Sequence, residues 1–440
     1  MKKLLLSLFV AGMAMPLLAP TTSNSVDPLI NGPKSLYIGE YSDKTEYIKH
    51  ATEVNAQMAD EGFTLLKNDG TLPLPAGTRI SVCGKSSTNL ARGGAGSGAG
   101  STSSGVTAID LQKSLTDAGF EINPTLTDFY KGSKSGSGRT NGNDGWKGNS
   151  EVTIGETPWS SYSQTEIDSF KEYNDVAIQV LTREGSEGCD VLTVDATDST
   201  KFGYSEKHAL ELSDNEQDLY DHLKENFEKI IIVINSSNIF ECDNFMKDEK
   251  VAGILWIGNP GDVGPGAVGR ILSGQVNPSG HTVDTWTRDF SKDPTWQNFS
   301  DNRHTNVAIP DTTNRLKHAA QDTMFAADGS PMLSYGTDKD YKDHSAPRWL
   351  EEEQKVVKGG INGVKPAAYV SYEEGIYMDY RYYETRYADL AKTNQAAADA
   401  WYNGDEGVVF PFGYGLSYTT FSQEIVRTNI PANSALTANN

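Results

Sequence analysis

The sequence has 440 residues, of which 59 are acidic and 38 are lysine or arginine, so the formal net charge is -21 at pH 7. This length predicts two or three structural units rather than one domain. A surface this acidic repels nucleic acid and anionic lipid, which argues against a nucleic-acid-binding or membrane-surface protein and is compatible with a neutral ligand.

The N-terminus has the pattern of a secretory signal peptide. Two lysines precede an apolar run from Leu4 to Ala14, and Pro16 follows this run. The run is shorter than the roughly twenty apolar residues that a membrane-spanning helix needs. We therefore expect residues 1–19 to be a cleaved signal peptide and the mature protein to be secreted, either extracellular or periplasmic.

From about Ala51 to Arg288 short apolar runs alternate with helical patterns. The predicted strands are mostly continuous apolar runs, as in strands buried on both faces of a sheet. They span Arg79–Cys83, Val176–Leu181, Lys229–Asn235, Gly253–Ile257 and Thr282–Trp286. The predicted helices span Ile48–Glu61, Ile109–Ala118, Asp214–Asn226 and Gly264–Leu272. After a lead segment at residues 20–50, this alternation predicts an α/β domain with a parallel sheet over residues 51–290.

The rest of the sequence is less regular. Residues 131–163 are rich in Gly, Ser and Asn and predict a surface excursion. Residues 291–400 predict a second irregular excursion and a linker. Within it, the tyrosine cluster Tyr377–Tyr383 is interpreted as core, because its residue types alternate as on a strand. A further domain is expected to begin within residues 401–440 and not to finish there.

Eight short motifs follow one another along the chain. They are Glu61–Leu74 (EGFTLLKNDGTLPL), Arg92–Gly98 (RGGAGSG), Glu184–Asp190 (EGSEGCD), Ile231–Ser236 (IIVINS), Asn259–Gly264 (NPGDVG), Gly274–Gly280 (GQVNPSG), Tyr372–Tyr383 (YEEGIYMDYRYY) and Phe410–Tyr418 (FPFGYGLSY). As an ordered set they resemble glycoside hydrolase family 3, a β-glucosidase-like family. The resemblance implies that residues 51–290 are the family's parallel-sheet (α/β)6 sandwich. It also implies that residues 401–440 begin a fibronectin type III-like β-sandwich.

The resemblance also implies a retaining glycoside hydrolase. Such an enzyme needs one carboxyl group that protonates the leaving oxygen and a second, about 5–5.5 Å away, that attacks the anomeric carbon. The motif that begins at Glu184 is similar to the family's S-G-E-G-x-D segment, which supplies the proton donor. This register makes Glu187 the general acid/base, with Glu184 as the alternative. Arg92 and Asp190 are candidate substrate-binding residues. The Glu184–Asp190 motif follows the predicted strand Val176–Leu181. This position agrees with a general rule, since ligands of open α/β sheets gather outside the carboxyl ends of strands.

The nucleophile of the family is not found in this chain. It is an aspartate in an S/T-D-W motif on a (β/α)8 barrel, a domain of about 250 residues for which no pattern is present. Since the signal peptide precedes the sandwich domain, the chain resembles the family members with exchanged domain order, in which the barrel comes last. We therefore expect the chain to need a barrel in cis or on another fragment and to be inactive alone. The alternative is a non-catalytic accessory or sugar-binding protein derived from this domain.

No metal or organic cofactor is expected, because two carboxyl groups perform this hydrolysis unaided. The segment Gly93–Gly100 lacks the Gly-Lys-Ser/Thr ending of a P-loop and therefore does not predict nucleotide binding. Cys83, Cys189 and Cys242 lack metal-ligand spacing, and we interpret them as buried or free thiols. The expected ligand is an oligosaccharide or an aryl or alkyl β-glycoside. β-Glucosides are favoured over β-xylosides and α-arabinosides.

Overall fold

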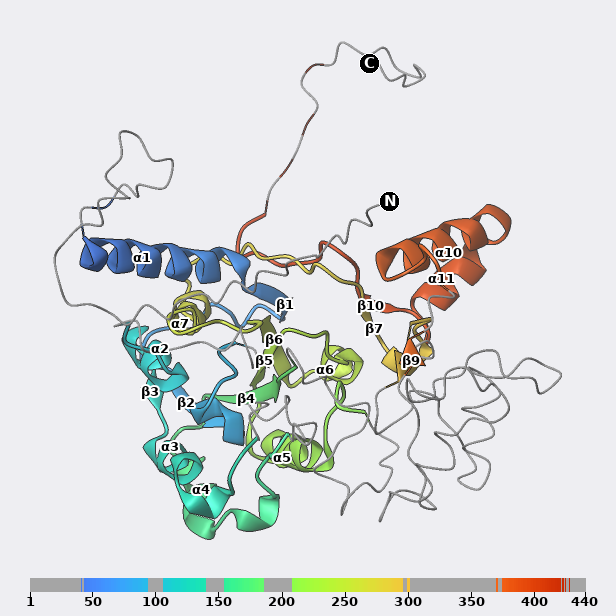
Figure 1. Cartoon of the computed structure of the whole chain (residues 1–440). Coiled ribbons are helices and arrows are strands. Elements are labelled where there is room, and N and C mark those ends of the chain that lie inside the picture. The colour runs from blue at the N-terminus through green and yellow to red at the C-terminus, as the bar shows by residue number, and fades with distance from the viewer. Residues whose placement is uncertain are drawn as a thin grey trace, which may run out of the picture. The chain divides into compact units, whose positions relative to one another are not determined.

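A computed structural model describes residues 41, 43–93, 106–139, 154–185, 208–295, 374–420, 422, 424 and 427, and the backbone of 299–300 and 369–370 (Figure 1). The chain divides into two units, residues 1–50 and 51–440. In the first unit, Asp43 accepts hydrogen bonds from the backbone N–H groups of Thr45 and Glu46 and so caps the start of α1 (Lys44–Gly62). Among the described residues, no helix is long and apolar enough to cross a membrane.

The second unit is built around one six-stranded sheet with the strand order β1-β6-β5-β4-β2-β3. The strands are β1 (Thr64–Asn68), β2 (Arg79–Cys83), β3 (Glu121–Ile122), β4 (Val176–Arg183), β5 (Ile230–Ser236) and β6 (Val251–Trp256). Only β1 runs antiparallel to its neighbour; the other pairs of this sheet are parallel. The α/β prediction is confirmed in the form of a mixed, mostly parallel sheet. Four of the five predicted strands lie in this sheet, and β1 and β3 were missed.

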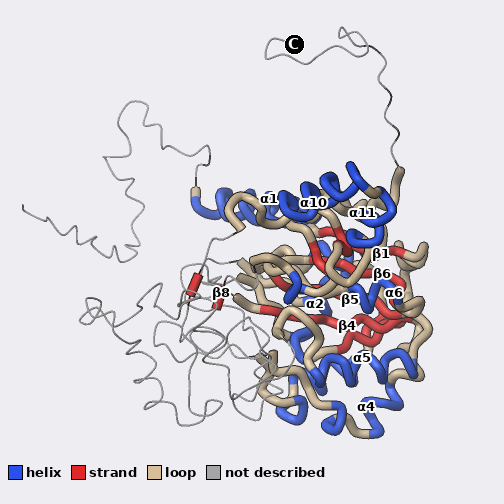
Figure 2. Tube along the Cα trace, turned by 90° about the vertical axis from the view of Figure 1, so that its right-hand side faces the viewer, coloured by secondary structure: helices blue, strands red, loops and turns tan. Residues whose placement is uncertain are grey.

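Helices cover both faces of this sheet (Figure 2). One core cluster joins the sheet to α3 (Pro124–Lys131), α4 (Gln164–Ser169), α5 (Asp214–Asn226) and α6 (Asp243–Lys247). The other joins the opposite face to α1, α2 (Leu111–Asp117) and α7 (Gly266–Leu272). β4 is buried along its whole length, because successive side chains enter the two clusters in turn. This explains why the central strands are continuous apolar runs in the sequence.

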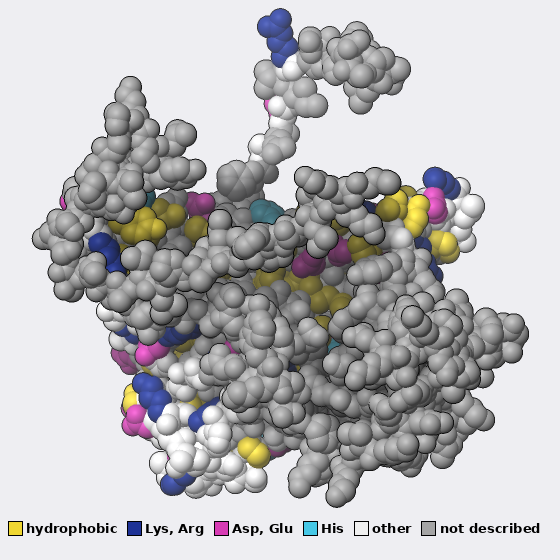
Figure 3. Space-filling model, in the orientation of Figure 1, with side chains coloured by type: hydrophobic (Ala, Val, Ile, Leu, Met, Phe, Trp, Pro, Cys, Tyr) yellow, Lys and Arg dark blue, Asp and Glu magenta, His cyan; other side chains and the backbone are white. Residues whose placement is uncertain are grey.

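Side-chain caps fix where several helices begin. Ser213 and Glu216 form a reciprocal capping box at the start of α5, and Asp110 accepts a hydrogen bond from the Lys113 N–H at the start of α2. The predicted helix at residues 214–226 is confirmed, because α5 has these bounds. On the described surface, acidic and basic side chains lie side by side (Figure 3), as in the exposed Lys113–Asp117 pair.

The expected strand Thr282–Trp286 is not a member of the main sheet. Only Trp286–Thr287 forms a strand, β7, and it pairs antiparallel with β10 (Val408–Phe410). Before β7 the chain instead bonds to the segment that follows β10, since Thr282 N–H donates to the Tyr414 carbonyl at 2.7 Å. The end of the expected strand thus belongs to a separate two-stranded sheet. A further pair, β8 (Phe299–Ser300) and β9 (Tyr369–Val370), is also antiparallel.

The two regions expected to be irregular contain ordered parts. In residues 131–163, the side chains of Glu156, Thr157 and Tyr162 are buried, so this region is not entirely a surface excursion. Residues 140–153 lie outside the described residues. In residues 291–400, α10 (Tyr380–Thr393) packs against α11 (Gln395–Tyr402). An irregular linker was expected here, and these two helices were not predicted from the sequence.

The tyrosine cluster is helical from Tyr380 onward, so the expected strand-like alternation is wrong. Tyr383 is core: its ring stacks on Trp401 and its hydroxyl donates to Asp293 at 2.9 Å. Tyr377, in contrast, is 49% exposed. Because β10 pairs with β7, residues 408–410 are tied to the α/β unit. The fibronectin type III-like domain expected at residues 401–440 stays a prediction.

Candidate functional site

The strand order reverses between β2 and β4, which makes the carboxyl ends of these two strands the switch point of the sheet. Gly84 turns the chain directly after β2 with φ 100°. A side-chain carbon at this position would lie 2.8 Å from the Val180 carbonyl oxygen of β4, so only glycine lets the turn pass so close. Glu184 follows the last residue of β4. The predicted site segment therefore begins at the switch point.

Two of the predicted site residues, Glu187 and Asp190, lie outside the described residues, and their roles stay predictions. The alternative acid/base residue, Glu184, is described. Its carboxylate accepts a hydrogen bond from Arg139 Nε at 2.8 Å, and its side chain is only 9% exposed. A buried carboxylate engaged by a guanidinium is poorly placed to reach a glycosidic oxygen. This contact argues against Glu184 as the acid/base.

Arg92 lies in the loop after β2, and this loop is anchored from two sides. Asn235, at the end of β5, exchanges hydrogen bonds of 2.6 and 2.9 Å with the backbone of Ala91. The Arg92 carbonyl accepts the Gly261 N–H, and its guanidinium donates to the Asp262 carbonyl at 3.1 Å. The Arg92 side chain is 28% exposed. Arg92 is thus tethered to the loop after β6 and keeps donors available for a ligand hydroxyl.

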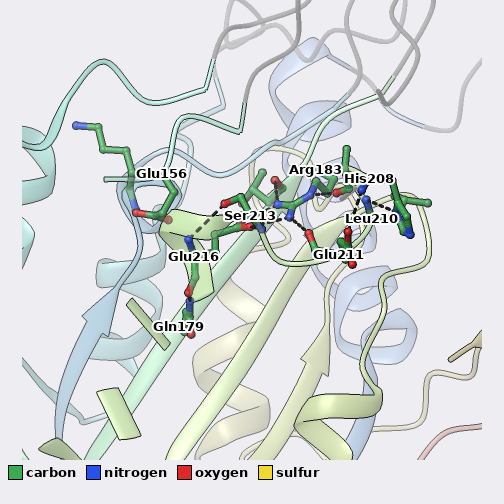
Figure 4. Close-up of polar contacts among 11 residues, drawn as sticks. Glu156, Gln179, Arg183, His208, Leu210, Glu211, Ser213 and Glu216 are labelled. Carbon is green, nitrogen blue, oxygen red and sulfur yellow. Dashed lines mark hydrogen bonds and ion pairs between the residues drawn. The ribbon is translucent and has the colours of Figure 1, made fainter. Parts of the chain in front are cut away.

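A buried ion pair anchors the end of β4 (Figure 4). Arg183 donates to both carboxylate oxygens of Glu216 at 2.7 Å and to the Glu211 carbonyl at 2.7 Å, and its guanidinium lies over the Phe240 ring. Arg183 is 3% exposed and Glu216 is 1% exposed. This pair was not predicted from the sequence. The available signal was the Ser213-x-x-Glu216 capping box together with an arginine at the end of an apolar strand.

Glu156 is a second buried carboxyl group that the sequence analysis missed. Its Oε1 atom accepts the backbone N–H groups of Lys85 at 2.9 Å and Thr157 at 2.7 Å, directly beside the turn after β2. Burial, helped by the nearby Glu216 carboxylate, raises the pKa of Glu156 to about 7, although these hydrogen bonds and Arg183 act in the opposite direction. Glu156 is therefore a carboxyl group that titrates near neutral pH inside the core.

The raised pKa predicts that Glu156 weakens the fold as pH rises. Its folded-state pKa lies above the unfolded value, so the folded protein favours the protonated form, and stability is lost between about pH 4.5 and 7. Relative to wild type, Glu156→Gln should therefore gain stability over this interval, by up to about 3 kcal/mol at pH 8. Urea unfolding at pH 4 and pH 8 measures the difference.

Glu166→Gln is the matched control. Hydrogen bonds from Ser163 outweigh the slight burial of Glu166 and lower its pKa, so this variant should show the opposite pH trend. A stability difference between Glu156→Gln and wild type that does not change with pH would contradict the assignment.

His208, Glu241 and Asp289 bring three possible metal-ligand atoms within 4.8 Å of one another. The Nδ1 atom of His208 accepts the Leu210 N–H at 3.2 Å, so the ring proton lies on Nε2, which donates to Glu241 Oε1 at 3.0 Å. A neutral histidine binds a metal through its unprotonated nitrogen, which here is already used. The hydrogen bonding of this cluster therefore does not favour a metal site.

The sequence is similar to a known protein family and to curated members of it. The family model described as "Glycosyl hydrolase family 3 C-terminal domain" matches residues 63–380. Beta-glucosidase A of Butyrivibrio fibrisolvens is 25% identical over 406 residues, which are 89% of this chain but 38% of that protein. The Beta-glucosidase of Ruminococcus albus is 29% identical over 273 residues, 61% of this chain and 26% of that protein. The chain thus spans well under half of the length of these curated relatives.

Solved structures agree on the fold. The structure of beta-glucosidase 3B from Thermotoga neapolitana in complex with glycerol superposes with a TM-score of 0.52 at 23% identity. The match covers 87% of this chain and 39% of that one. At this identity the likeness extends to the fold alone.

Proposed function

Because the chain belongs to glycosyl hydrolase family 3 through the C-terminal domain of that family, we propose that it is part of a retaining, exo-acting β-glycosidase. In this proposal the enzyme is β-glucosidase-like and hydrolyses terminal glycosides. The observation that carries the proposal is the position of the Glu184–Asp190 motif, which starts directly after β4 at the switch point of the sheet. The names of the curated relatives, which are β-glucosidases and β-xylosidases, support the substrate class.

In the proposed mechanism Glu187 acts twice. As an acid it gives its proton to the glycosidic oxygen while a second carboxylate attacks the anomeric carbon, so that the C–O bond to the leaving group breaks and a glycosyl-enzyme forms. As a base it then takes a proton from water, whose oxygen attacks the anomeric carbon and releases the second carboxylate. The Arg183–Glu216 pair fixes the end of β4 from which this segment departs. The second carboxylate comes from a barrel supplied in cis or by another fragment.

The purified chain alone is expected to show negligible turnover of aryl β-glucosides. A proton donor cannot replace an attacking carboxylate and the sugar pocket that accompanies it. The assay is nitrophenol release from aryl β-glucosides by the chain with and without a barrel-bearing polypeptide encoded beside it. Activity of the mixture, with retention at the anomeric carbon, supports the proposal. Retaining hydrolysis by the chain alone would remove the need for a barrel.

The accessory-protein alternative makes a different prediction. If the chain is a non-catalytic descendant of this domain, the neighbouring DNA encodes no barrel with a Ser/Thr-Asp-Trp motif, and no added barrel restores hydrolysis. The expected secretion is tested in the same preparation, by finding the mature chain outside the cytoplasm with residues 1–19 removed.

A further inference from the structure

One guanidinium joins the loops that follow β2 and β4. Arg139 Nε donates to Glu184 Oε2 at 2.8 Å, and Arg139 Nη1 donates to the Asn89 carbonyl. Glu184 directly follows β4, and Asn89 lies in the loop after β2. The side chains of Arg139 and Glu184 are 6% and 9% exposed. Water therefore screens this pair little, and its geometry is set by the planar fork of the guanidinium.

The backbone that carries Arg139 is itself held in place. A side-chain carbon on Gly155 would lie 2.5 Å from the Arg139 nitrogen, so the segment after residue 153 packs directly on the backbone of Arg139. Nearby, the Thr157 hydroxyl donates to the Ser135 carbonyl at 2.8 Å. The packed backbone therefore fixes the position of the guanidinium. Its hydrogen bonds in turn fix the two loops that it contacts.

Both loops lead into candidate site residues. Asn89 precedes Arg92 by three positions, and Glu184 precedes Glu187 by three positions. We propose that Arg139 is a positioning residue, which holds Glu184, the first residue of the Glu184–Asp190 motif, close to the loop that leads to Arg92. This inference rests on the proposed function of Glu187. It also gives Glu184 a role as the partner of Arg139 instead of the acid/base.

The test compares two leaving groups in the enzyme completed by a barrel. A displaced acid impairs glycosylation only where the leaving group needs a proton, whereas partial unfolding lowers kcat/KM equally for all substrates. Arg139→Met should therefore lower kcat/KM for cellobiose relative to 2,4-dinitrophenyl β-glucoside about tenfold or more, since a small misplacement of a reacting group is enough for such a loss. Arg139→Lys, which keeps the charge but not the fork, should lose less.

Arg79→Met is the matched control. Arg79 also pairs with a carboxylate, Asp175, but this pair is exposed and lies at the opposite, amino end of β2. The control should leave the ratio of the two kcat/KM values unchanged. If Arg139→Met lowers both substrates equally, or neither, Arg139 has no positioning role and the inference is overturned.

A parallel Glu187→Ala variant separates this inference from the proposed function. If Glu187→Ala leaves the ratio of kcat/KM for cellobiose to kcat/KM for 2,4-dinitrophenyl β-glucoside unchanged, the proposed function fails. If Glu187→Ala lowers this ratio but Arg139→Met does not, only the present inference fails. Hydrogen exchange on the chain alone gives a second measurement without catalysis. Arg139→Met should speed exchange of the backbone amides of residues 86–91 about tenfold relative to Arg79→Met, and equal exchange in the two variants also overturns the inference.

Discussion

In the enzyme completed by a barrel, Glu187→Ala is expected to lower kcat/KM for poor leaving groups by about 10²- to 10⁴-fold, the usual contribution of a general acid. An alkyl or sugar leaving group departs slowly without a proton, whereas an activated aryl group departs without one. The kcat/KM value for 2,4-dinitrophenyl β-glucoside should therefore be nearly unchanged. Its kcat should fall, because hydrolysis of the glycosyl-enzyme lacks a base. Steady-state kinetics with a series of leaving groups measures both effects.

Azide gives an independent check on this assignment. As an anion that needs no proton removal, azide attacks the glycosyl-enzyme directly, so it should restore much of the kcat of Glu187→Ala and yield the β-glycosyl azide. Glu184→Ala should have a smaller effect and show no azide rescue, since the Glu184 carboxylate is buried against Arg139. The reverse behaviour of the two variants would assign the acid/base role to Glu184.

Arg183→Met is expected to destabilise the α/β unit by about 3–5 kcal/mol, the range found when one partner of a buried ion pair is removed. The substitution leaves the Glu216 carboxylate, which is 1% exposed, without its guanidinium, and it removes the donor to the Glu211 carbonyl. The loss is large because the protein interior does not replace the hydration that an unpaired carboxylate has in water. Urea unfolding followed by circular dichroism measures the loss.

Two further variants test the cause of this loss. In Arg183→Met with Glu216→Leu the uncompensated charge is gone, so stability should recover by more than half of the loss. Arg79→Met removes an exposed pair with Asp175 and should leave the urea midpoint nearly unchanged. If the double variant is as unstable as Arg183→Met, the loss comes from packing around Phe240 and the backbone contacts, and the ion-pair explanation is wrong.

Local sequence signals were sufficient for four strands of the main sheet and for the helix α5. The runs that became β2, β4, β5 and β6 are apolar because these strands are buried, and this burial leaves a mark within a few consecutive residues. The sequence signal for the start of α5 was equally local, since Ser213 and Glu216, which form its capping box, lie within one turn. The same signals failed for β7, because a short strand-like pattern does not specify which sheet the strand joins. The ordered motifs gave the family, and the register within one motif gave Glu187.

Only the tertiary structure decided which side chains meet at the carboxyl ends of the strands. Arg183 and Glu216 are 33 positions apart, Arg139 and Glu184 are 45 apart, and Lys85 and Glu156 are 71 apart. No periodicity spans such separations. The contacts exist because the order β4-β2-β3, in which β3 lies on the far side of β2, makes β2 and β4 neighbours and brings these loops to one edge of the sheet. The sequence by itself therefore determined the α/β class, the family and the candidate acid/base. The buried pairs at the ends of β2 and β4 follow from strand order, which depends on the packing of the whole domain.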